Sequence, residues 1–581
     1  MKRKKYLLVI CILCLFLAFL GFLLKKNSPV EDVHLAVVYK NLDGNNIVVN
    51  IWRKPNTDTA YFFLPSFVQM QNGSFQSRHE YVIGEHVVSD GSSTGFFEMD
   101  SCYKFIGACN KCNSINYLFF LRSENIGSIH LTCRQKTEEK KIHSDRNYKA
   151  TVSASLYNYD GSLLYENNNV KINCRGNSTW RPPKKAYVLT LPQNARLMDM
   201  PEGKKWLLLA NAFDESNIRN AIVLDFAENL GLAWTPKYDF VDVYLNGDYR
   251  GVYMLTEKIE IGSNRLNISS SEGGGYLLCM TSQNRIKARG VADYFMTKNN
   301  QPIEIVDQSS TIDSKEQLIA LFQRMEDAIM LADTSKQDSV ANYLDLDSWV
   351  KKYLIDEIFE NGDGGVRSSY YYTYGVTDSS KIYGGPVWDY DMAMGNTYKN
   401  ARPNTFLPLR TRASIYDYSP YYYKLYHNGD FFEKIKLTYK NQCVDLLDAL
   451  VESGIDNKAS RISAALRLNS IRWKSQFQEN RDRVGSTVVS MEEIKSWLRA
   501  RKSFLDSAWI YGVQYCLVSI EQETDGVFCT YAVIKGDLLS SVLDVIALGE
   551  MKHYYNTADG LDFESEKPII EDMELRIRKT K

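Results

Sequence analysis

Short runs of β-branched and aromatic residues, separated by turn residues, fill the chain from about residue 30 to residue 145. Apolar positions in these runs alternate with polar ones, which is the pattern of a half-buried strand. The clearest runs are residues 35–39, 47–52 and 117–121. We therefore expect an all-β accessory domain over residues 30–145, and nothing in it has the pattern of a catalytic site.

A second region opens at about residue 146 and begins with strands. Further strands are expected at residues 150–156, 170–172, 240–245 and 251–255. The last two flank Asn246-Gly247, a strong signal for a two-residue hairpin because both positions tolerate a positive φ.

One helix is expected between these strands. Apolar residues recur at every fourth position from Ile218 to Leu230, which is the spacing of one helix face. Ser216 is placed to cap the start of this helix, and Gly231 to end it.

The chain after about residue 310 is mostly helical in pattern. Helices are expected near residues 315–331, 348–359, 431–451, 458–476 and 491–509. The segment 361–408 interrupts them with loops, strands and many glycines, and such an island between helices is where a site is expected. From residue 513 the pattern returns to strands and turns, which predicts a small β-rich module over residues 513–581.

The amino terminus has the pattern of a membrane anchor. Four basic residues within Met1–Lys5 precede an apolar run of nineteen residues, 6–24, and Lys25-Lys26 follow it. At about 1.5 Å of rise per residue this run can cross a hydrocarbon core of roughly 30 Å. The run is longer than a usual signal peptide and lacks a small-residue cleavage site, so an uncleaved anchor over residues 1–26 is favoured over a cleaved signal. The excess of basic residues before the run predicts a single-pass protein of the cell membrane whose bulk is extracytoplasmic.

Composition and charge narrow the function classes. The chain has 69 Lys plus Arg against 70 Asp plus Glu, so no overall positive field marks it as a nucleic-acid binder, and we expect no nucleic-acid partner. Four cysteines, Cys102, Cys109, Cys112 and Cys133, lie close together in the sequence. The C-x-x-C spacing of the middle pair is common in zinc sites, but the other pair lacks it, which favours disulfides or buried thiols.

Two stretches of the second region have residues that suit a nucleotide. Arg175-Gly-Asn-Ser-Thr-Trp180 offers backbone N–H groups and hydroxyls that can hold phosphate oxygens, and Lys184 or Lys185 offers a point charge after it. The alternative for this stretch is an ordinary polar turn. The segment 255–257 is a candidate to lie beside a purine ring, and the alternative is a simple hairpin that packs the core.

Two acidic loops in the island carry the strongest chemical pattern. Asp363 follows Asn361-Gly362, and Asp389-Tyr390-Asp391 follows a strand-like run, with glycines near both. Phosphoryl transfer from a nucleotide needs one carboxylate that orients or deprotonates the acceptor hydroxyl and others that bind Mg²⁺. The alternative is that Asp363 caps a turn and that Asp389 and Asp391 are calcium ligands or surface charges.

Six segments of the chain, taken together, resemble the successive motifs of the spore-coat protein H (CotH) kinase family. They occur in the family's order and cover roughly residues 146–512. They are RGNSTW with the following PKKAY, KKWLLLANAFDESNIRN at 204–220, VDVYLNGDYRGVYMLTEKIE at 241–260, NGDGGVRSSYYYTY at 361–374, GGPVWDYDMAMGN at 384–396 and WLRARKSFLD at 497–506.

The resemblance implies an α+β chain with a two-lobed, protein-kinase-like domain over residues 146–512. It implies binding of ATP and Mg²⁺ and phosphorylation of Ser or Thr on a protein substrate, such as a spore-coat or cell-surface protein. Arg175, Asn177 and Ser178 would belong to the loop that covers the phosphates, with Lys185 or Lys184 as the phosphate-binding lysine.

The resemblance also assigns the remaining site residues. Glu257 would fall in the segment that links the two lobes, Asp363 would be the catalytic aspartate, and Asp389, with Asp391 as the second candidate, would bind the metal. Protein kinases place an Asn five residues after the catalytic Asp as a second metal ligand, whereas this chain has Ser368 there.

Two further functions stay open on the residues. A non-catalytic surface or scaffold protein with a kinase-like fold agrees with the extracytoplasmic topology, because ATP is scarce outside a cell. A calcium-stabilised adhesion module would use the Asp389 and Asp391 pair.

Overall fold

The computed structural model describes residues 33–42, 44–107, 115–176, 178–268, 274–310, 314–332, 340–396, 402–409, 419–484, 488–521, 528–543 and 554–577. The chain divides into two compact units. Unit 1 contains Met1–Ser123 and Gly247–Tyr249, and unit 2 contains Glu124–Asn246 and Arg250–Lys581.

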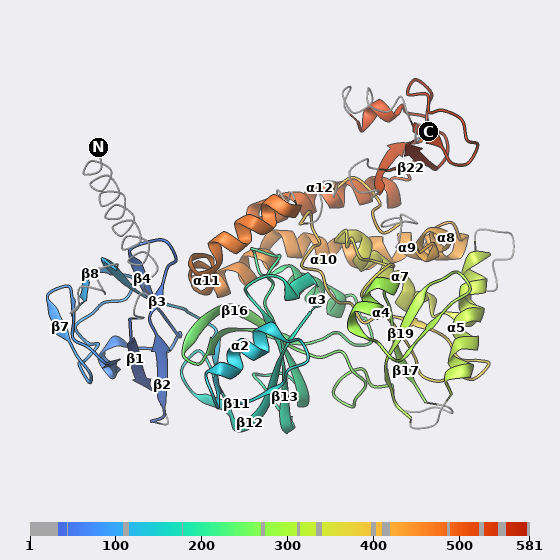
Figure 1. The fold of residues 1–581 in the computed structure, drawn as a ribbon. Helices are drawn as coiled ribbons and strands as arrows, with labels where there is room; N and C mark the ends of the chain where they lie inside the picture. The colour runs from blue at the N-terminus through green and yellow to red at the C-terminus, as the bar shows by residue number, and fades with distance from the viewer. Residues whose placement is uncertain are drawn as a thin grey trace, which may run out of the picture. The chain divides into compact units, whose positions relative to one another are not determined.

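Unit 1 consists of two β-sheets (Figure 1). The smaller sheet has the order β2-β1-β5, with β1 (Leu35–Lys40), β2 (Asn46–Asn50) and β5 (Gly73–Ser77). The larger has the order β3-β4-β9-β8-β6-β7, with β3 (Trp52–Arg53), β4 (Thr59–Leu64), β9 (Tyr117–Arg122), β8 (Cys102–Gly107), β6 (Tyr81–Ile83) and β7 (His86–Val88). Phe62 and Phe75, from the two sheets, are buried against each other. The strands expected at 35–39 and 117–121 are present, and the one expected at 47–52 is broken between β2 and β3.

Unit 2 begins with a closed β-barrel. Its strands follow one another around the barrel as β10 (Gly127–Cys133), β11 (Ala150–Tyr157), β12 (Leu163–Arg175), β13 (Ala186–Ala195), β14 (Gly203–Leu209), β16 (Asp248–Glu257) and β15 (Tyr238–Leu245), which pairs with β10 in parallel. Residues facing each other across β12 and β13, such as Ile172 and Leu189, are buried in its core. The barrel therefore includes β10 and helix α2 (Thr137–Ser144), which lie before the start at 146 expected for this region.

Helix α3 (Arg219–Asn229) connects the barrel strands and is buried along most of its length. Its predicted end is present, since Gly231 has a positive φ of 78°. The helix begins later than predicted, with Ile218 rather than Ser216 at the N-cap. The Ser216 hydroxyl accepts the Ile218 N–H at 3.4 Å and donates to Asp214 Oδ1, and the Asp214 carboxylate accepts the Arg219 N–H at 3.0 Å. A hydroxyl and a carboxylate thus share the free N–H groups at this helix start.

The second part of unit 2 is a five-stranded sheet covered by helices. Its order is β18-β19-β17-β20-β21, with β18 (Tyr294–Met296), β19 (Pro302–Gln308), β17 (Tyr276–Met280), β20 (Ser369–Thr373) and β21 (Tyr383–Gly384). Helices α4 (Gln283–Arg289), α5 (Lys315–Met330), α6 (Val340–Tyr343) and α7 (Leu346–Ile358) lie between its strands in the sequence. Asp345 caps α7 by accepting the Ser348 N–H, and Trp349 stacks on Tyr371 of the sheet at 4.7 Å between ring centroids.

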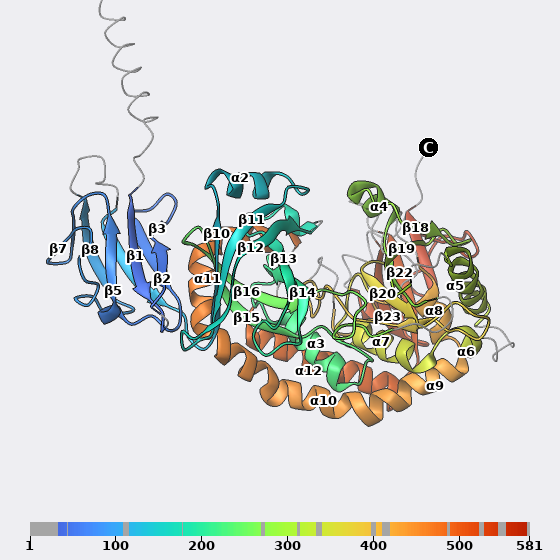
Figure 2. The same ribbon diagram turned by 90° about the horizontal axis from the view of Figure 1, so that it is seen from below.

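A long helical run follows and passes from this sheet to the barrel (Figures 1 and 2). It comprises α8 (Tyr421–Tyr426), α9 (Gly429–Thr438), α10 (Val444–Ala449) and α11 (Ile455–Val484), with π-helical segments at Tyr439–Cys443 and Leu450–Gly454. α11 reaches the barrel through side chains, since Gln476 Oε1 accepts the Lys184 N–H at 2.8 Å and Trp473 Nε1 donates to the Arg250 carbonyl at 2.9 Å. α12 (Met491–Trp509) starts at a capping box of Ser490 and Glu493 and has the bounds expected from the sequence.

The carboxyl-terminal part folds as a four-stranded sheet of order β23-β22-β25-β24. Its strands are β22 (Tyr515–Glu521), β23 (Phe528–Ile534), β24 (Tyr554–Asn556) and β25 (Met573–Ile577). Tyr423 of α8 donates to Asp572 Oδ2 at 2.7 Å, and Thr405 donates to the Thr530 carbonyl at 2.7 Å. The expected β-rich module is thus packed on the helical part of unit 2.

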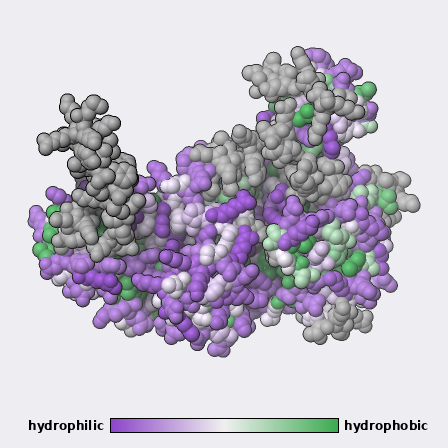
Figure 3. All heavy atoms as spheres, in the orientation of Figure 1, coloured by the Kyte–Doolittle hydropathy of each residue, from purple (hydrophilic) through white to green (hydrophobic). Residues whose placement is uncertain are grey.

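The expectations for the amino terminus and for the cysteine group fall largely outside the described residues. This holds for the predicted anchor at 1–26 and for Cys109 and Cys112, whereas Cys102 and Cys133 are free thiols. Among the residues that the structure describes, none of the helices combines the length and apolar character needed to cross a membrane. Hydrophilic residues cover most of the face drawn in Figure 3.

Candidate functional site

The loop that carries Asp363 rests on a buried polar centre at the end of α7. Asp356 Oδ2 accepts hydrogen bonds from Lys352 Nζ at 2.8 Å and from Tyr422 Oη at 2.7 Å. Asp356 Oδ1 accepts from Tyr390 Oη at 2.5 Å and from Asn361 Nδ2 at 3.2 Å. Asp356 therefore joins the start of the Asp363 loop to the loop that carries Asp389.

The second loop is fixed to α3. The Arg219 guanidinium, which is buried, donates to the carbonyls of Ala393 at 2.9 Å and Val488 at 2.6 Å, and it pairs with Asp214 at 2.6 Å. Asn220 Oδ1 accepts the Tyr390 N–H at 2.8 Å. The chain from Tyr390 to Ala393 is held by side chains from one helix, which leaves little freedom for the aspartates beside it.

Strained backbone is concentrated in these two loops. Asn and Asp tolerate a positive φ, but Glu, Ser and Met rarely adopt it. Glu360, Ser368 and Met394 have φ of 51°, 50° and 50°, and Asp389 has φ of 73°. Among described residues other than Gly, Asn and Asp, Met198 alone shares this conformation outside the loops. Strain of this kind persists only where the surroundings impose it, and it clusters at functional sites.

A continuous chain of hydrogen bonds joins the two predicted site aspartates. Arg285 of α4 donates through Nη2 to Asp363 Oδ2 at 3.2 Å and through Nη1 to Ser368 Oγ at 2.8 Å. Ser368 Oγ in turn donates to Asp389 Oδ2 at 3.3 Å. Arg367 contacts the other carboxylate oxygen of Asp363 at 3.3 Å. The structure thus brings Asp363, Ser368 and Asp389 together, as the resemblance implied.

In the second loop, the charged forms of the Asp389 and Asp391 carboxyls are disfavoured. Burial and then the neighbouring carboxylate of Asp363 raise the pKa of Asp389, while Arg285 and Arg175 act in the opposite direction. Burial and then the charges of Asp389, Asp214 and Asp363 raise the pKa of Asp391 well above its ordinary value. The pKa of both carboxyls is therefore raised despite the arginines nearby.

The barrel contributes Arg175 to this region. Its guanidinium lies over the Trp388 ring at 5.5 Å from the ring centroid, and its charge is close enough to lower the pKa of Asp389. Gly176 follows with a φ of 108°, and a Cβ there would lie 1.8 Å from Thr179 Oγ1, so only glycine fits this turn. Ser178 is exposed, and Asn177 lies outside the described residues.

The two candidate lysines differ in their surroundings. Lys184 is fully buried, donates to the Val252 carbonyl at 2.7 Å, and has its pKa lowered to about 7 by burial, against which Asp242 and Asp214 act. Lys185 donates to the Trp180 carbonyl at 2.5 Å, and its lowered pKa reflects burial first. Asp214 also acts on Asp391, so Lys184 is the lysine whose charge is electrostatically linked to the acidic loops.

Glu257 has a structural arrangement of its own. Its carboxylate is fully buried, pairs with Arg265 at 2.5 Å and accepts the Lys237 N–H at 2.9 Å. Burial raises its pKa, and the Lys237 N–H and Arg265 counteract this. The side chain of Glu257 thus fixes the end of β16. Both of its carboxylate oxygens have partners within the protein.

Several residues at the site were not selected from the sequence. Arg285 and Asp356 lie outside the motifs and had no local signal, because their roles depend on contacts with residues far along the chain. Asp214 and Arg219 stand within the segment 204–220 that carried the family resemblance. The motif in that segment could have identified Asp214 and Arg219 as candidates, but it does not indicate their roles.

The carboxylates offer oxygen ligands of the kind that Mg²⁺ prefers. Mg²⁺ is usually bound by one or two carboxylates together with phosphate oxygens and waters rather than by a cage of protein groups. Within the described ranges, no three His, Cys, Asp or Glu side chains converge closely enough to hold a metal ion by themselves. A divalent cation at Asp389 and Asp391 would offset the carboxylate charges that, after burial, raise the pKa of Asp391.

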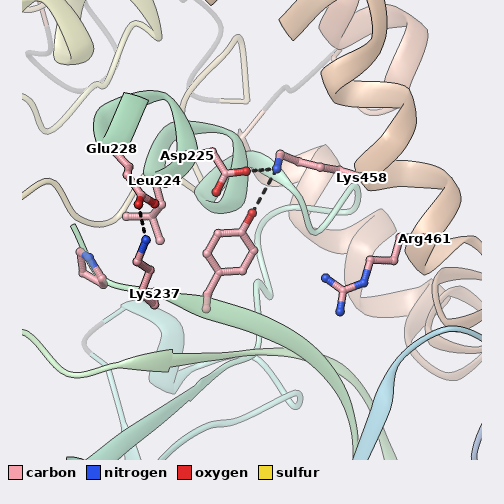
Figure 4. Close-up of a pocket in the computed structure, with 8 residues that line it drawn as sticks. Leu224, Asp225, Glu228, Lys237, Lys458 and Arg461 are labelled. Atoms are coloured by element: carbon pink, nitrogen blue, oxygen red, sulfur yellow. Dashed lines mark hydrogen bonds and ion pairs between the residues drawn. The ribbon is translucent and has the colours of Figure 1, made fainter. Parts of the chain in front are cut away.

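A separate polar pocket of about 250 Å³ lies between α3 and α11 (Figure 4). Asp225 pairs with Lys458, which also contacts Tyr238 Oη at 3.2 Å. Glu228 pairs with Lys237, and Arg461 pairs with Asp239 at 2.5 Å. The charges of this pocket are thus matched by partners within the protein.

Comparison with known proteins identifies the family. A comparison with protein-family models matches residues 172–505 to the family described as CotH kinase protein. A comparison with curated proteins finds no match. The matched range covers more than half of the 581 residues and includes the barrel strands β13 to β16, α3, both acidic loops and most of α12. The chain belongs to the CotH kinase family.

Proposed function

We propose that this chain is a phosphotransferase that uses ATP and Mg²⁺ to phosphorylate serine or threonine hydroxyls of a protein substrate. Membership of the CotH kinase family supports a kinase-like function. The observation that carries the proposal is the hydrogen-bonded chain Asp363, Arg285, Ser368 and Asp389, which holds two carboxylates from different loops side by side on strained backbone.

In the proposed mechanism, Asp363 orients the acceptor hydroxyl and takes its proton during transfer. Arg285 and Arg367 fix the carboxylate of Asp363 from two sides. Asp389 and Asp391 would hold Mg²⁺, which would offset the negative charge of the nucleotide phosphates. Arg175 supplies a positive charge from the barrel side, where the phosphates are expected.

Lys184 is the better candidate for the lysine of the nucleotide site. Its link to Asp214 supports this choice, and its ammonium group, which has three N–H donors, can keep the bond to the Val252 carbonyl while it donates to a phosphate. Lys185 stays the alternative.

We further propose that the substrate is a cell-surface or spore-coat protein. Support comes from the apolar run at 6–24 and the basic residues before it, which predict that the rest of the chain lies outside the cytoplasm. Protease accessibility of the carboxyl-terminal end in intact cells would test this topology, and protection from the protease would contradict it.

A non-catalytic scaffold is the second candidate, favoured by Ser368, which stands where protein kinases carry a metal-binding Asn. Calorimetry with ATP and Mg²⁺ on the full chain separates the two functions. Heat of binding supports the enzyme, and its absence supports the scaffold.

The enzymatic assignment is tested by transfer of the labelled γ-phosphate from ATP. Asp363→Asn is expected to reduce the rate about 10²- to 10⁴-fold, the usual range for loss of a general base, without unfolding the protein. Asp378→Asn, at a fully exposed carboxylate, serves as the matched control. Undiminished transfer by Asp363→Asn would remove Asp363 from the mechanism.

A further inference from the structure

Arg285 reaches the acidic loops because of strand pairing. β17 pairs antiparallel with β20, and Met280 faces Ser369 in the register. α4 begins immediately after β17, with Ser282 as its N-cap, so Arg285 lies beside the residue that precedes β20. Its guanidinium forms a bridge from Ser368 Oγ at 2.8 Å to Asp363 Oδ2 at 3.2 Å.

The hydroxyl of Ser368 has two hydrogen-bond partners in this arrangement. A serine hydroxyl has one proton to donate and two lone pairs to accept with. Ser368 donates its proton towards Asp389 Oδ2 at 3.3 Å and accepts from Arg285. The guanidinium therefore lies on the hydroxyl oxygen that would otherwise face a metal ion.

The guanidinium of Arg285 lies beside the residue position that protein kinases use to bind a second metal ion. They use an Asn five residues after the catalytic Asp as a ligand of the second Mg²⁺. In this chain that position is Ser368, whose side chain is neutral and shorter than that of Asn. The positively charged guanidinium of Arg285 lies against its oxygen. Two like charges a few ångströms apart repel strongly in a partly buried site, so a cation bound at Ser368 is disfavoured while Arg285 is present.

We propose that Arg285 takes the place of the second metal ion, so that the site binds one divalent cation per nucleotide, held by Asp389 and Asp391. This inference rests on the proposed ATP-dependent function. Arg285 is a positioning residue in this scheme: it keeps Asp363 oriented and supplies, as a permanent charge, part of what a second Mg²⁺ supplies elsewhere.

The test is a metal count rather than an activity. Mn²⁺ is titrated into the full chain, kept in detergent, with a saturating non-hydrolysable ATP analogue, and free Mn²⁺ is followed by electron paramagnetic resonance. The wild type is expected to bind one Mn²⁺ per bound nucleotide. The double variant Arg285→Ala with Ser368→Asn, which removes the fixed charge and restores the ligand, is expected to bind two.

Two matched variants control for structural effects. Lys287→Ala removes an exposed charge from the same helix and is expected to keep one Mn²⁺. Arg285→Lys keeps a charge and is also expected to keep one. If the double variant does not fold, Arg285→Gln with Ser368 intact is used, and its phosphate transfer is expected to fall about 10- to 100-fold and to recover partly at high Mn²⁺.

The outcomes separate this inference from the function beneath it. Two Mn²⁺ per nucleotide in the wild type, or an unchanged count of one in a folded double variant, would overturn the role of Arg285 and leave the ATP-dependent function standing. No binding of the nucleotide analogue by the wild type would overturn the proposed function itself.

Discussion

Two charged regions of unit 2 contrast in how their charges are balanced. In the pocket between α3 and α11, Asp225, Glu228 and Asp239 each have a cation of their own. In the acidic loops, Asp389 and Asp391 lie near Asp363 and one another, and the pKa of both is raised by burial first and by neighbouring carboxylates next. A region whose carboxylates each pair with one cation is complete without a ligand, whereas carboxylates that lie close together beside strained backbone indicate a site that a cation completes.

The largest expected difference between the regions is in catalysis. Asp389→Asn removes a carboxylate that we propose as a metal ligand, and we expect it to lower phosphate transfer by at least about 10²-fold, because the charge on the transferred phosphate is then poorly offset. Asp225→Asn removes a carboxylate of the pocket and is expected to leave transfer unchanged. Parallel rate measurements with labelled ATP check both, and equal losses in the two variants would erase the contrast.

A buried ion pair also lies beside the site, and breaking it is expected to destabilise the protein. Arg219 and Asp214 are buried and paired at 2.6 Å. Arg219→Met leaves Asp214 charged and unpaired in the interior and should lower the free energy of unfolding by about 3–5 kcal/mol. Urea unfolding measures this, with Arg461→Met in the pocket as the comparison. A loss below about 1 kcal/mol for Arg219→Met would show that the pair does not hold the second loop.

Replacing the buried carboxyl of Asp391 by a neutral amide is expected to stabilise the protein without ligands. Burial and then the neighbouring carboxylates raise the pKa of Asp391, and Asp391→Asn removes the cost of ionising this group, so the free energy of unfolding near neutral pH is expected to rise.

The pH dependence gives the sign of this effect. Because folding raises the pKa of Asp391, the folded state keeps its proton where the unfolded state has lost it, so wild-type stability falls as the pH rises from the ordinary Asp pKa through the raised one. The advantage of Asp391→Asn should therefore grow over that window and level off above it. Thermal unfolding at a series of pH values checks this, and an advantage that is greatest at low pH would contradict it.

The smallest effects are expected in the pocket. Lys458 and Asp225 are partly exposed, at 19% and 39%, so solvent screens their attraction. Replacing both, by Lys458→Met and Asp225→Asn, is expected to change the unfolding free energy by less than about 1 kcal/mol. A double-mutant cycle at two salt concentrations measures the pair, and a coupling above about 2 kcal/mol would mean that the pocket is as important to the fold as the buried pair at Arg219.

Local patterns predicted the elements well where one face of an element is buried. The bounds of α12 and of the β15 and β16 hairpin follow from spacing, capping and the Asn246-Gly247 turn, in which both residues have a positive φ. The cap predicted at Ser216 was wrong in position, because the helix begins after Ile218 and Asp214 accepts the Arg219 N–H, while the Ser216 hydroxyl accepts the Ile218 N–H. The expected helix at 431–451 was correct in position, but two π-helical segments interrupt the run, and no sequence spacing indicated them.

The sequence by itself determined the family, the order of the elements and the aspartates on which the proposed chemistry depends, because motifs and periodicity are properties of short segments. Only the tertiary structure decided how these aspartates are held. Arg285 is 78 residues from Asp363, and Arg219 is 174 residues from Ala393. Their hydrogen bonds depend on strand register and on the packing of α3 and α4, which are long-range properties. The raised pKa of Asp389 and Asp391 is caused first by burial, and burial is set by the whole fold.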